Sequence, residues 1–234
     1  MDKLQKYKPT DKMIDLIGDN YSLLQVMSRF GLSLGFGDKT VKEVCEMNNV
    51  DCQTFLVVVN FMAEGFSRMD GSADDISIPA LVDYLRQAHI YFLDYCLPAI
   101  RRKLIEAIDC SQDDVSFLIL KFFDGYMREV RKHMEYEEKT VFKYVDTLIR
   151  GNAPKNYQIS TFSKHHDQVG ERLTELKNII IKYCPAKANT NVLNAALFDI
   201  YACEEGLESH CKVEDYLFVP AILKLERRMR ENEK

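Results

Sequence analysis

The stretch RKHMEYEEKTVFKY, residues 131–144, places His133 four residues before Glu137. On an α-helix, residues four apart lie on one face of the helix, one turn apart. The imidazole and the carboxylate can therefore be directed at the same point. The later stretch ESHCKVEDYLFVPAI repeats this spacing, with His210 and Glu214.

Two further histidines stand in a matching register. His89 precedes His133 by 44 residues, and His166 precedes His210 by the same 44 residues. The pattern of one His, followed on the next helix by His-x-x-x-Glu, therefore occurs twice. His165 is next to His166 and so lies about 100° around a helix from it. We expect His165 to be a surface or neighbouring residue rather than a member of the set.

These polar positions fall on otherwise apolar helical stripes. His89 is in helical phase with Leu85 and Phe92, and His210 is in phase with Cys203 and Leu207. Charged groups in such a core are costly unless they are paired or bound to a metal. The pattern favours a metal site, and a structural bundle that holds no metal is the alternative.

The sequence predicts a site for two metal ions in the core of one bundle. Each ion takes two imidazole nitrogens, and both carboxylates bridge the pair together with an oxo or hydroxo group. This gives about five ligands per ion and leaves open positions, and the mixed donors favour iron, manganese or zinc over calcium or magnesium. The predicted ligands are His89, His133, Glu137, His166, His210 and Glu214.

The composition favours helices, because Gly (10) and Pro (6) are scarce. Apolar periodicity predicts four long helices, with a kink at Pro98 and a bend or an end at Pro220. Their connections are short, so neighbouring helices are expected to be antiparallel. We therefore predict an all-α fold, an up-down-up-down four-helix bundle. The helices are expected over about residues 77–108, 112–150, 158–183 and 190–218, with a tail helix over about 223–230.

A small helical domain is expected before the bundle. Short helices are predicted from Met13 to Met27, over 39–47 and over 52–63. The following segment SRMDGSADD is polar and rich in helix breakers, which is typical of a linker. The predicted domains are residues 1–66, a linker at 67–77, and the bundle with its tail helix at 78–234.

Charge and composition exclude several classes of protein. The chain has 234 residues, with 47% hydrophobic and 29% charged residues and a net charge of −5, which argues against nucleic-acid binding. The apolar runs are too short to span a bilayer, and the polar start is unlike a secretory signal. The seven cysteines form no C-x-x-C pair, so we expect reduced thiols and a cytoplasmic protein without membrane contact.

A family resemblance rests on four motifs: QAHIYFLDYCLPAIRRKL, RKHMEYEEKTVFKY, HHDQVGERL and ESHCKVEDYLFVPAI. Residues 78–220 resemble a hemerythrin-like (HHE cation-binding) domain, and the whole chain resembles the di-iron proteins of the iron–sulfur cluster repair (RIC) family. The resemblance implies a non-haem di-iron centre held by the six residues above. Oxygen-carrying hemerythrins use a fifth His, where this chain offers Phe162 or Gly170, so the resemblance favours the repair type.

The stretch FGLSLGFGDKTVKEVCEMNNVD is similar to the short domain that precedes the bundle in these repair proteins. That domain usually carries two adjacent cysteines, where this chain has Gly35 and Phe36. The nearby Cys45 and Cys52 are expected to be packing residues rather than substitutes for that pair.

The resemblance implies a protein that repairs iron–sulfur clusters damaged by oxidative or nitrosative stress, with the damaged proteins as clients. Two alternatives remain. One is a di-iron redox enzyme acting on nitric oxide, dioxygen or peroxide, and the other is a sensor module that binds such small gases. The oligomeric state is left open, with a homodimer as one candidate.

Overall fold

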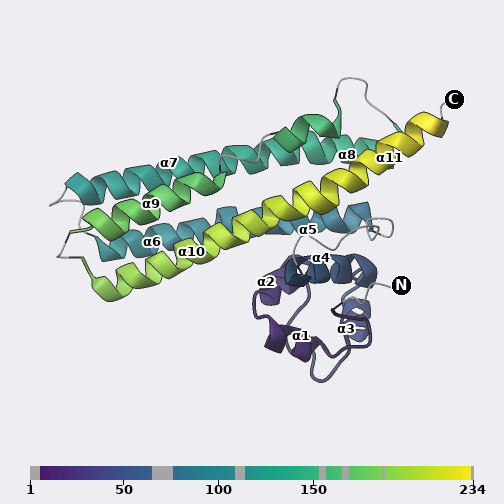
Figure 1. Cartoon of the computed structure of the whole chain (residues 1–234), viewed down its shortest axis with the longest axis horizontal. Coiled ribbons are helices and arrows are strands. Elements are labelled where there is room, and N and C mark those ends of the chain that lie inside the picture. The colour runs from purple at the N-terminus through teal and green to yellow at the C-terminus, as the bar shows by residue number, and fades with distance from the viewer. Residues whose placement is uncertain are drawn as a thin grey trace. The chain divides into compact units, whose positions relative to one another are not determined.

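The structure is a computed structural model, and the named elements of the part of the chain that it describes are all helices. Among these residues the one β-type pairing is an isolated bridge between Lys12 and Thr40. The expected all-α fold is therefore confirmed (Figure 1). The described residues are 6–64, 76–108, 114–152, 157–164, 169–185 and 188–232.

The chain divides into two compact units. One contains the residues up to Ala88 and those from Lys212 onward, and the other runs from His89 to Cys211. The predicted domain boundaries at 66 and 78 stay a prediction, and most of the predicted linker lies outside the described residues.

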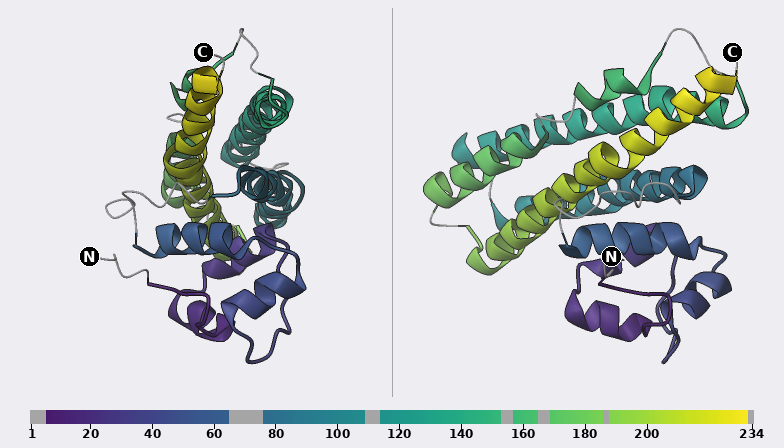
Figure 2. Two further views of the ribbon diagram at one scale, coloured as in Figure 1. Left: turned by 90° about the vertical axis from the view of Figure 1, so that its right-hand side faces the viewer. Right: turned by 45° about the vertical axis from the view of Figure 1, so that its right-hand side comes forward.

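The first unit begins with four short helices, whose order is visible in Figure 2. They are α1 (Met13–Asp19), α2 (Leu23–Arg29), α3 (Val41–Met47) and α4 (Cys52–Glu64). The prediction of one helix from Met13 to Met27 was wrong, because Asn20 is extended with φ −151° and separates α1 from α2. The Asn20 side chain accepts hydrogen bonds from the backbone and hydroxyl of Ser22, at 3.1 and 2.6 Å, which favours a turn over a continued helix.

Side-chain caps fix where the next two helices begin. Thr40 and Glu43 form a reciprocal capping box at the start of α3. The Asp51 carboxylate accepts a 2.7 Å hydrogen bond from the backbone of Thr54 and caps α4. Gly31 ends α2 with φ 73°, a left-handed conformation that favours glycine.

Two buried polar side chains hold the first unit together. Arg29 on α2 donates a 3.2 Å hydrogen bond to the hydroxyl of Tyr84 on α5 (Ile78–Ile90). Asn60 on α4 accepts from the backbone N–H of Tyr7 at 2.8 Å and donates to its carbonyl at 3.0 Å. Asn60 is 4% exposed, so it satisfies two backbone groups that water does not reach.

The second unit consists of long helices that lie side by side, as both views show (Figures 1 and 2). Ion pairs link them in the order expected for a bundle: Arg101 on α6 pairs with Asp124 on α7 at 2.6 Å, and Lys103 pairs with Asp199 on α10 at 2.5 Å. Arg172 on α9 contacts Glu129 on α7 at 2.5 Å. The elements are α6 (Leu97–Ala107), α7 (Asp114–Tyr136), α8 (Phe142–Ile149), η5 (Ile159–Lys164), α9 (Val169–Tyr183) and α10 (Thr190–Val213).

Three π-helical segments interrupt the predicted long helices. They are η3 (Tyr91–Cys96) after α5, η4 (Glu137–Val141) after α7 and η6 (Glu214–Phe218) after α10. The third predicted helix is also divided, into the 3₁₀ segment η5 and α9, with residues 165–168 between them outside the described residues.

The helical run does not end at Pro220, and α11 (Val219–Asn232) follows η6 directly. Pro98 likewise lies in the first turn of α6, two residues after η3 ends. A proline ring collides with the carbonyl four residues earlier in a regular helix. A preceding wide π turn relieves this clash, which explains why both prolines follow π segments.

A search of the described residues for membrane spans found none, because no helix there combines the necessary length with an apolar sequence.

Replacement of Asn60 tests the packing of the first unit. Asn60→Ala leaves the N–H and the carbonyl of Tyr7 buried without a partner, and we expect it to lower the free energy of unfolding by about 2–4 kcal/mol. Asn60→Asp keeps the acceptor for the Tyr7 N–H but places a buried carboxylate against the Tyr7 carbonyl, so it should not restore the lost stability at neutral pH. Urea unfolding followed by circular dichroism measures both, and equal stability of Asn60→Ala and wild type would contradict the assigned role.

Candidate metal centre

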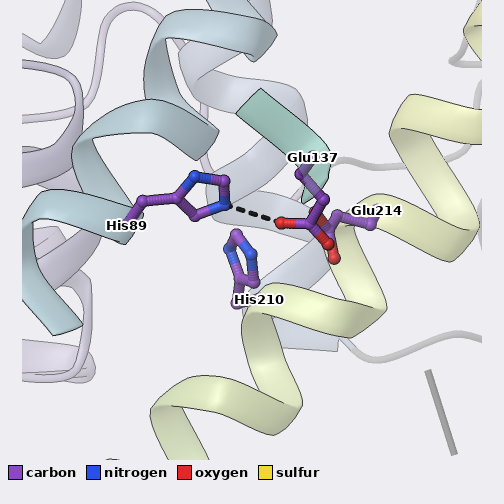
Figure 3. A group of neighbouring side chains, drawn as sticks. All are labelled: His89, Glu137, His210 and Glu214. Carbon is purple, nitrogen blue, oxygen red and sulfur yellow. Dashed lines mark ion pairs between the residues drawn. The ribbon is translucent and has the colours of Figure 1, made fainter. Parts of the chain in front are cut away.

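Four of the predicted ligands form one buried group, drawn in Figure 3. One ligand atom from each side chain lies within 4.8 Å of the ligand atoms of the others. All four residues are at most 3% exposed. The group consists of His89, Glu137, His210 and Glu214.

The π segments coincide with these residues. Glu137 is the first residue of η4, Glu214 is the first residue of η6, and η3 begins two residues after His89. A π turn has weaker hydrogen-bond geometry than an α turn and occurs mostly at functional sites. The helical runs that carry His89, Glu137 and Glu214 therefore depart from regular α-helical hydrogen bonding close to these residues.

The Glu137 carboxylate contacts an imidazole with each of its oxygens. Its Oε2 lies 2.9 Å from His89 Nε2, and its Oε1 lies 2.8 Å from His133 Nε2. His89 is on α5 and His133 is on α7, so one carboxylate connects nitrogen donors of two helices (Figure 3 marks the contact with His89). Imidazole nitrogens and carboxylate oxygens brought together in this way suit binding of a transition-metal ion.

The nitrogen that His89 offers to the centre is not used in a hydrogen bond. No partner with hydrogen-bond geometry lies near its Nε2 among the described residues, although Glu137 is only 2.9 Å away. A buried nitrogen without such a bond loses free energy unless something else binds it. A metal ion between the nitrogen and the carboxylate would remove that cost, so the residues present fit a metal.

Glu138 sets the orientation of the His89 ring. Its Oε1 lies 2.9 Å from His89 Nδ1, so Nδ1 carries the proton and Nε2 is left to face the centre. The ring also stacks on Phe142, with centroids 5.5 Å apart and planes at 12°. The sequence analysis did not identify Glu138. The available signal was its position directly after the predicted ligand Glu137.

Burial and charge oppose each other at the centre. Burial lowers the pKa of His89. The contacts with Glu137 and Glu138 together raise this pKa by more than burial lowers it, so the net shift is upward. Burial raises the pKa of Glu137, but His133 and His89 lower it far more, and this carboxyl stays ionised. A metal competes with protons for the His89 ring, so metal binding is expected to weaken as the pH falls through that raised pKa.

The six predicted ligands differ in where the structure places them. Four form the buried group, and His133 joins it through Glu137 with its side chain 13% exposed. His166 lies outside the described residues, as does its neighbour His165. The role of all six as ligands stays a prediction, and the nitrogen and oxygen donors present suit iron, manganese or zinc.

Comparison with known proteins gives one match. Residues 80–222 match the family model described as the hemerythrin HHE cation-binding domain. This segment contains every residue of the buried group. No curated protein matches the chain significantly.

Removal of the Glu138 charge tests its role in orienting His89. Glu138→Gln should weaken metal binding by about 10–100-fold, because the charged carboxylate that accepts from His89 Nδ1 becomes a neutral amide, whose oxygen is a weaker acceptor and whose NH2 group can take its place. The affinity is measured by competition with a chromophoric chelator.

The matched control is Glu135→Gln, on the same helix. Glu135 pairs with Lys139 at 2.7 Å and its side chain is 46% exposed. This variant should bind metal like the wild type. If the two variants weaken binding equally, Glu138 has no special role at the centre.

Proposed function

This chain belongs to the family of hemerythrin HHE cation-binding domains, and from that premise we propose that it is a di-iron protein of iron–sulfur cluster repair. Metal binding is the first part of the proposal and rests on the buried His/Glu group. The pair of ions and the repair role are the finer parts, and each needs its own support.

The contacts of Glu137 support a pair of ions rather than one. A carboxylate that meets imidazoles of two helices with its two oxygens is placed to bridge. Glu214, also fully buried, provides a second carboxylate in the same group. With His166 as the fourth imidazole, six side chains serve two ions and leave coordination positions open for a small molecule.

A bound iron pair supplies one-electron redox chemistry and open positions for small ligands such as nitric oxide or dioxygen. The chain itself supplies orientation and a dry site. Glu138 holds the His89 ring, and Phe142 stacks on its face. Burial of Glu137 and Glu214 excludes water from the carboxylates.

The repair role is supported by the resemblance of the whole chain to the repair proteins. The helices α1–α4 correspond to the short domain that precedes the bundle in them, and we propose that they contact the damaged client. The repair role assumes a cytoplasmic protein. Because Gly35 and Phe36 replace the usual cysteine pair, this contact does not use thiol chemistry at those two positions.

A redox enzyme acting on nitric oxide, dioxygen or peroxide is the second candidate, and it is supported by the same open positions. Turnover with an electron donor would favour this enzyme. Binding of gas in a fixed ratio without turnover would favour repair or sensing.

Metal content tests the first part of the proposal. Anaerobically purified protein loaded with ferrous iron should hold about two irons per chain, as the di-iron arrangement requires. His133→Ala, Glu214→Ala and His166→Ala should each lose metal, because a missing ligand leaves the site incomplete. Elemental analysis with an absorption spectrum measures this.

His165→Ala is the matched control, since His165 is adjacent to His166 but is not a predicted ligand. It should keep its full metal content. Full metal in His166→Ala, or far fewer than two irons in the wild type, would overturn the six-residue centre.

Reactivation of a damaged iron–sulfur enzyme tests the repair role. We expect the iron-loaded protein to restore activity to an iron–sulfur hydratase treated with nitric oxide, and Glu214→Ala to restore at most about a tenth as much because its site lacks a ligand. An equal effect of free ferrous iron at the same concentration would refute repair by this protein.

A further inference from the structure

A second layer of chemically active side chains lies along the helices that carry the metal ligands. Counted toward the same end of the bundle, the residues seven positions from His89, His133 and His210 are Cys96, Tyr126 and Cys203. In a regular α-helix seven residues are about two turns, or about 10 Å along the axis, and return to the same face, as from His133 to Tyr126 and from His210 to Cys203. Cys96 instead closes the π segment η3 that follows His89. The three residues are 8%, 1% and 2% exposed.

The side chains of this layer meet one another. The Cys203 thiol forms a hydrogen bond with the Cys96 thiol, and this bond together with burial holds the pKa of Cys203 well above its usual value. Burial, and then the nearby Cys203, raise the pKa of Tyr126. Cys96 is the last residue of η3 and Cys203 is on α10, so the two sulfurs come from different helices.

Simple packing does not explain this layer well. A single buried cysteine usually behaves as a small apolar residue. Here two thiols meet, and the buried Tyr126 hydroxyl beside them has no hydrogen-bond partner among the described residues. Apolar side chains of similar size would avoid the cost of burying that hydroxyl.

We propose that Cys96 and Cys203 form a reversible disulfide that exchanges electrons with the metal pair, an inference that rests on the proposed function. Both S–H bonds break and one S–S bond forms. The two electrons reduce two trivalent iron ions by one unit each, and the two protons pass to water. In the reverse direction, two ferrous ions and two protons return the disulfide to thiols. The thiol pair therefore stores as many electrons as two irons release.

Because the Cys96 and Cys203 thiols are buried, an oxidant inside the protein is favoured over one dissolved in the solvent. Soluble disulfides and peroxides react with thiolates, and the raised pKa of Cys203 keeps its thiol protonated. Both sulfurs are also shielded from solvent. The proposed metal pair, whose ligands lie on the same helical runs, is the redox partner available inside the bundle.

The chain contains its own control pair. Cys45 on α3 and Cys52 on α4 are also hydrogen-bonded through their thiols, and burial raises the pKa of both. Neither helix carries a predicted metal ligand. Oxidation that depends on the metal should therefore act on Cys96 and Cys203 and not on this pair.

The experiment compares full-length wild-type protein in three forms: loaded anaerobically with ferrous iron, loaded with redox-inert zinc, and free of metal. Each form is treated with ferricyanide, denatured in N-ethylmaleimide and digested. Mass spectrometry should find the Cys96–Cys203 cross-link in the iron form at more than about ten times its level in the other two. The Cys45–Cys52 cross-link should not differ among them. The experiment uses the wild-type protein alone, so a folding defect of a variant cannot affect the result.

A redox titration adds a second measurement. The iron-loaded wild type should consume about four equivalents of ferricyanide, two for the irons and two for the disulfide couple. Cys203→Ala should bind the same iron and consume about two.

The outcomes separate the two proposals, because iron content is measured in the same samples. Full iron without the cross-link, or equal cross-linking in the zinc form, overturns the thiol pair alone. A wild type that binds no iron overturns the proposed function, and the electron exchange with it.

Discussion

The burial of two carboxylates among apolar helices is the constraint on which the rest of this structure depends. Glu137 and Glu214 are both 0% exposed, and an isolated ionised carboxylate in such a place is prohibitively costly. Imidazoles at 2.8 and 2.9 Å reduce this cost for Glu137 and keep its pKa low. Positive charge of this kind, from protonated His or from metal, is required for the core to form around these residues.

The same constraint explains the irregular backbone. Regular α-helices would present the ligands at fixed steps of 100°, whereas the segments that begin at Glu137 and Glu214 are π-helical. Each segment shifts the phase of the residues that follow it. The wide turns also accommodate Pro98 and Pro220, which a regular helix would not. Site geometry and proline tolerance thus have one structural cause.

Much of this arrangement could be predicted from the sequence, because helical periodicity is a strong signal. The 44-residue intervals and the two His-x-x-x-Glu pairs indicated which residues would meet; His89, Glu137, His210 and Glu214 form one buried group, and the role of the six as ligands stays a prediction. The break at Asn20 was not predicted, since it depends on a local side-chain hydrogen bond. The π segments and Glu138 were not predicted either, because a 3.6-residue repeat does not reveal where hydrogen bonding shifts or which of two adjacent carboxylates turns outward.

The two layers of the bundle also differ in how they tolerate the absence of metal. The ligand layer contains the ionised Glu137 carboxyl, and the contacts of His89 with Glu137 and Glu138 outweigh burial and raise the pKa of that ring. In the layer of Cys96, Tyr126 and Cys203, burial raises the pKa of Tyr126, and the contact with Cys96 together with burial raises the pKa of Cys203, so these two groups stay neutral without an ion. Loss of metal should therefore loosen the helices around Glu137 and leave the packing of the thiol layer in place. A stable neutral layer beside a charge-dependent one gives the site a fixed frame on which the metal ligands can be assembled.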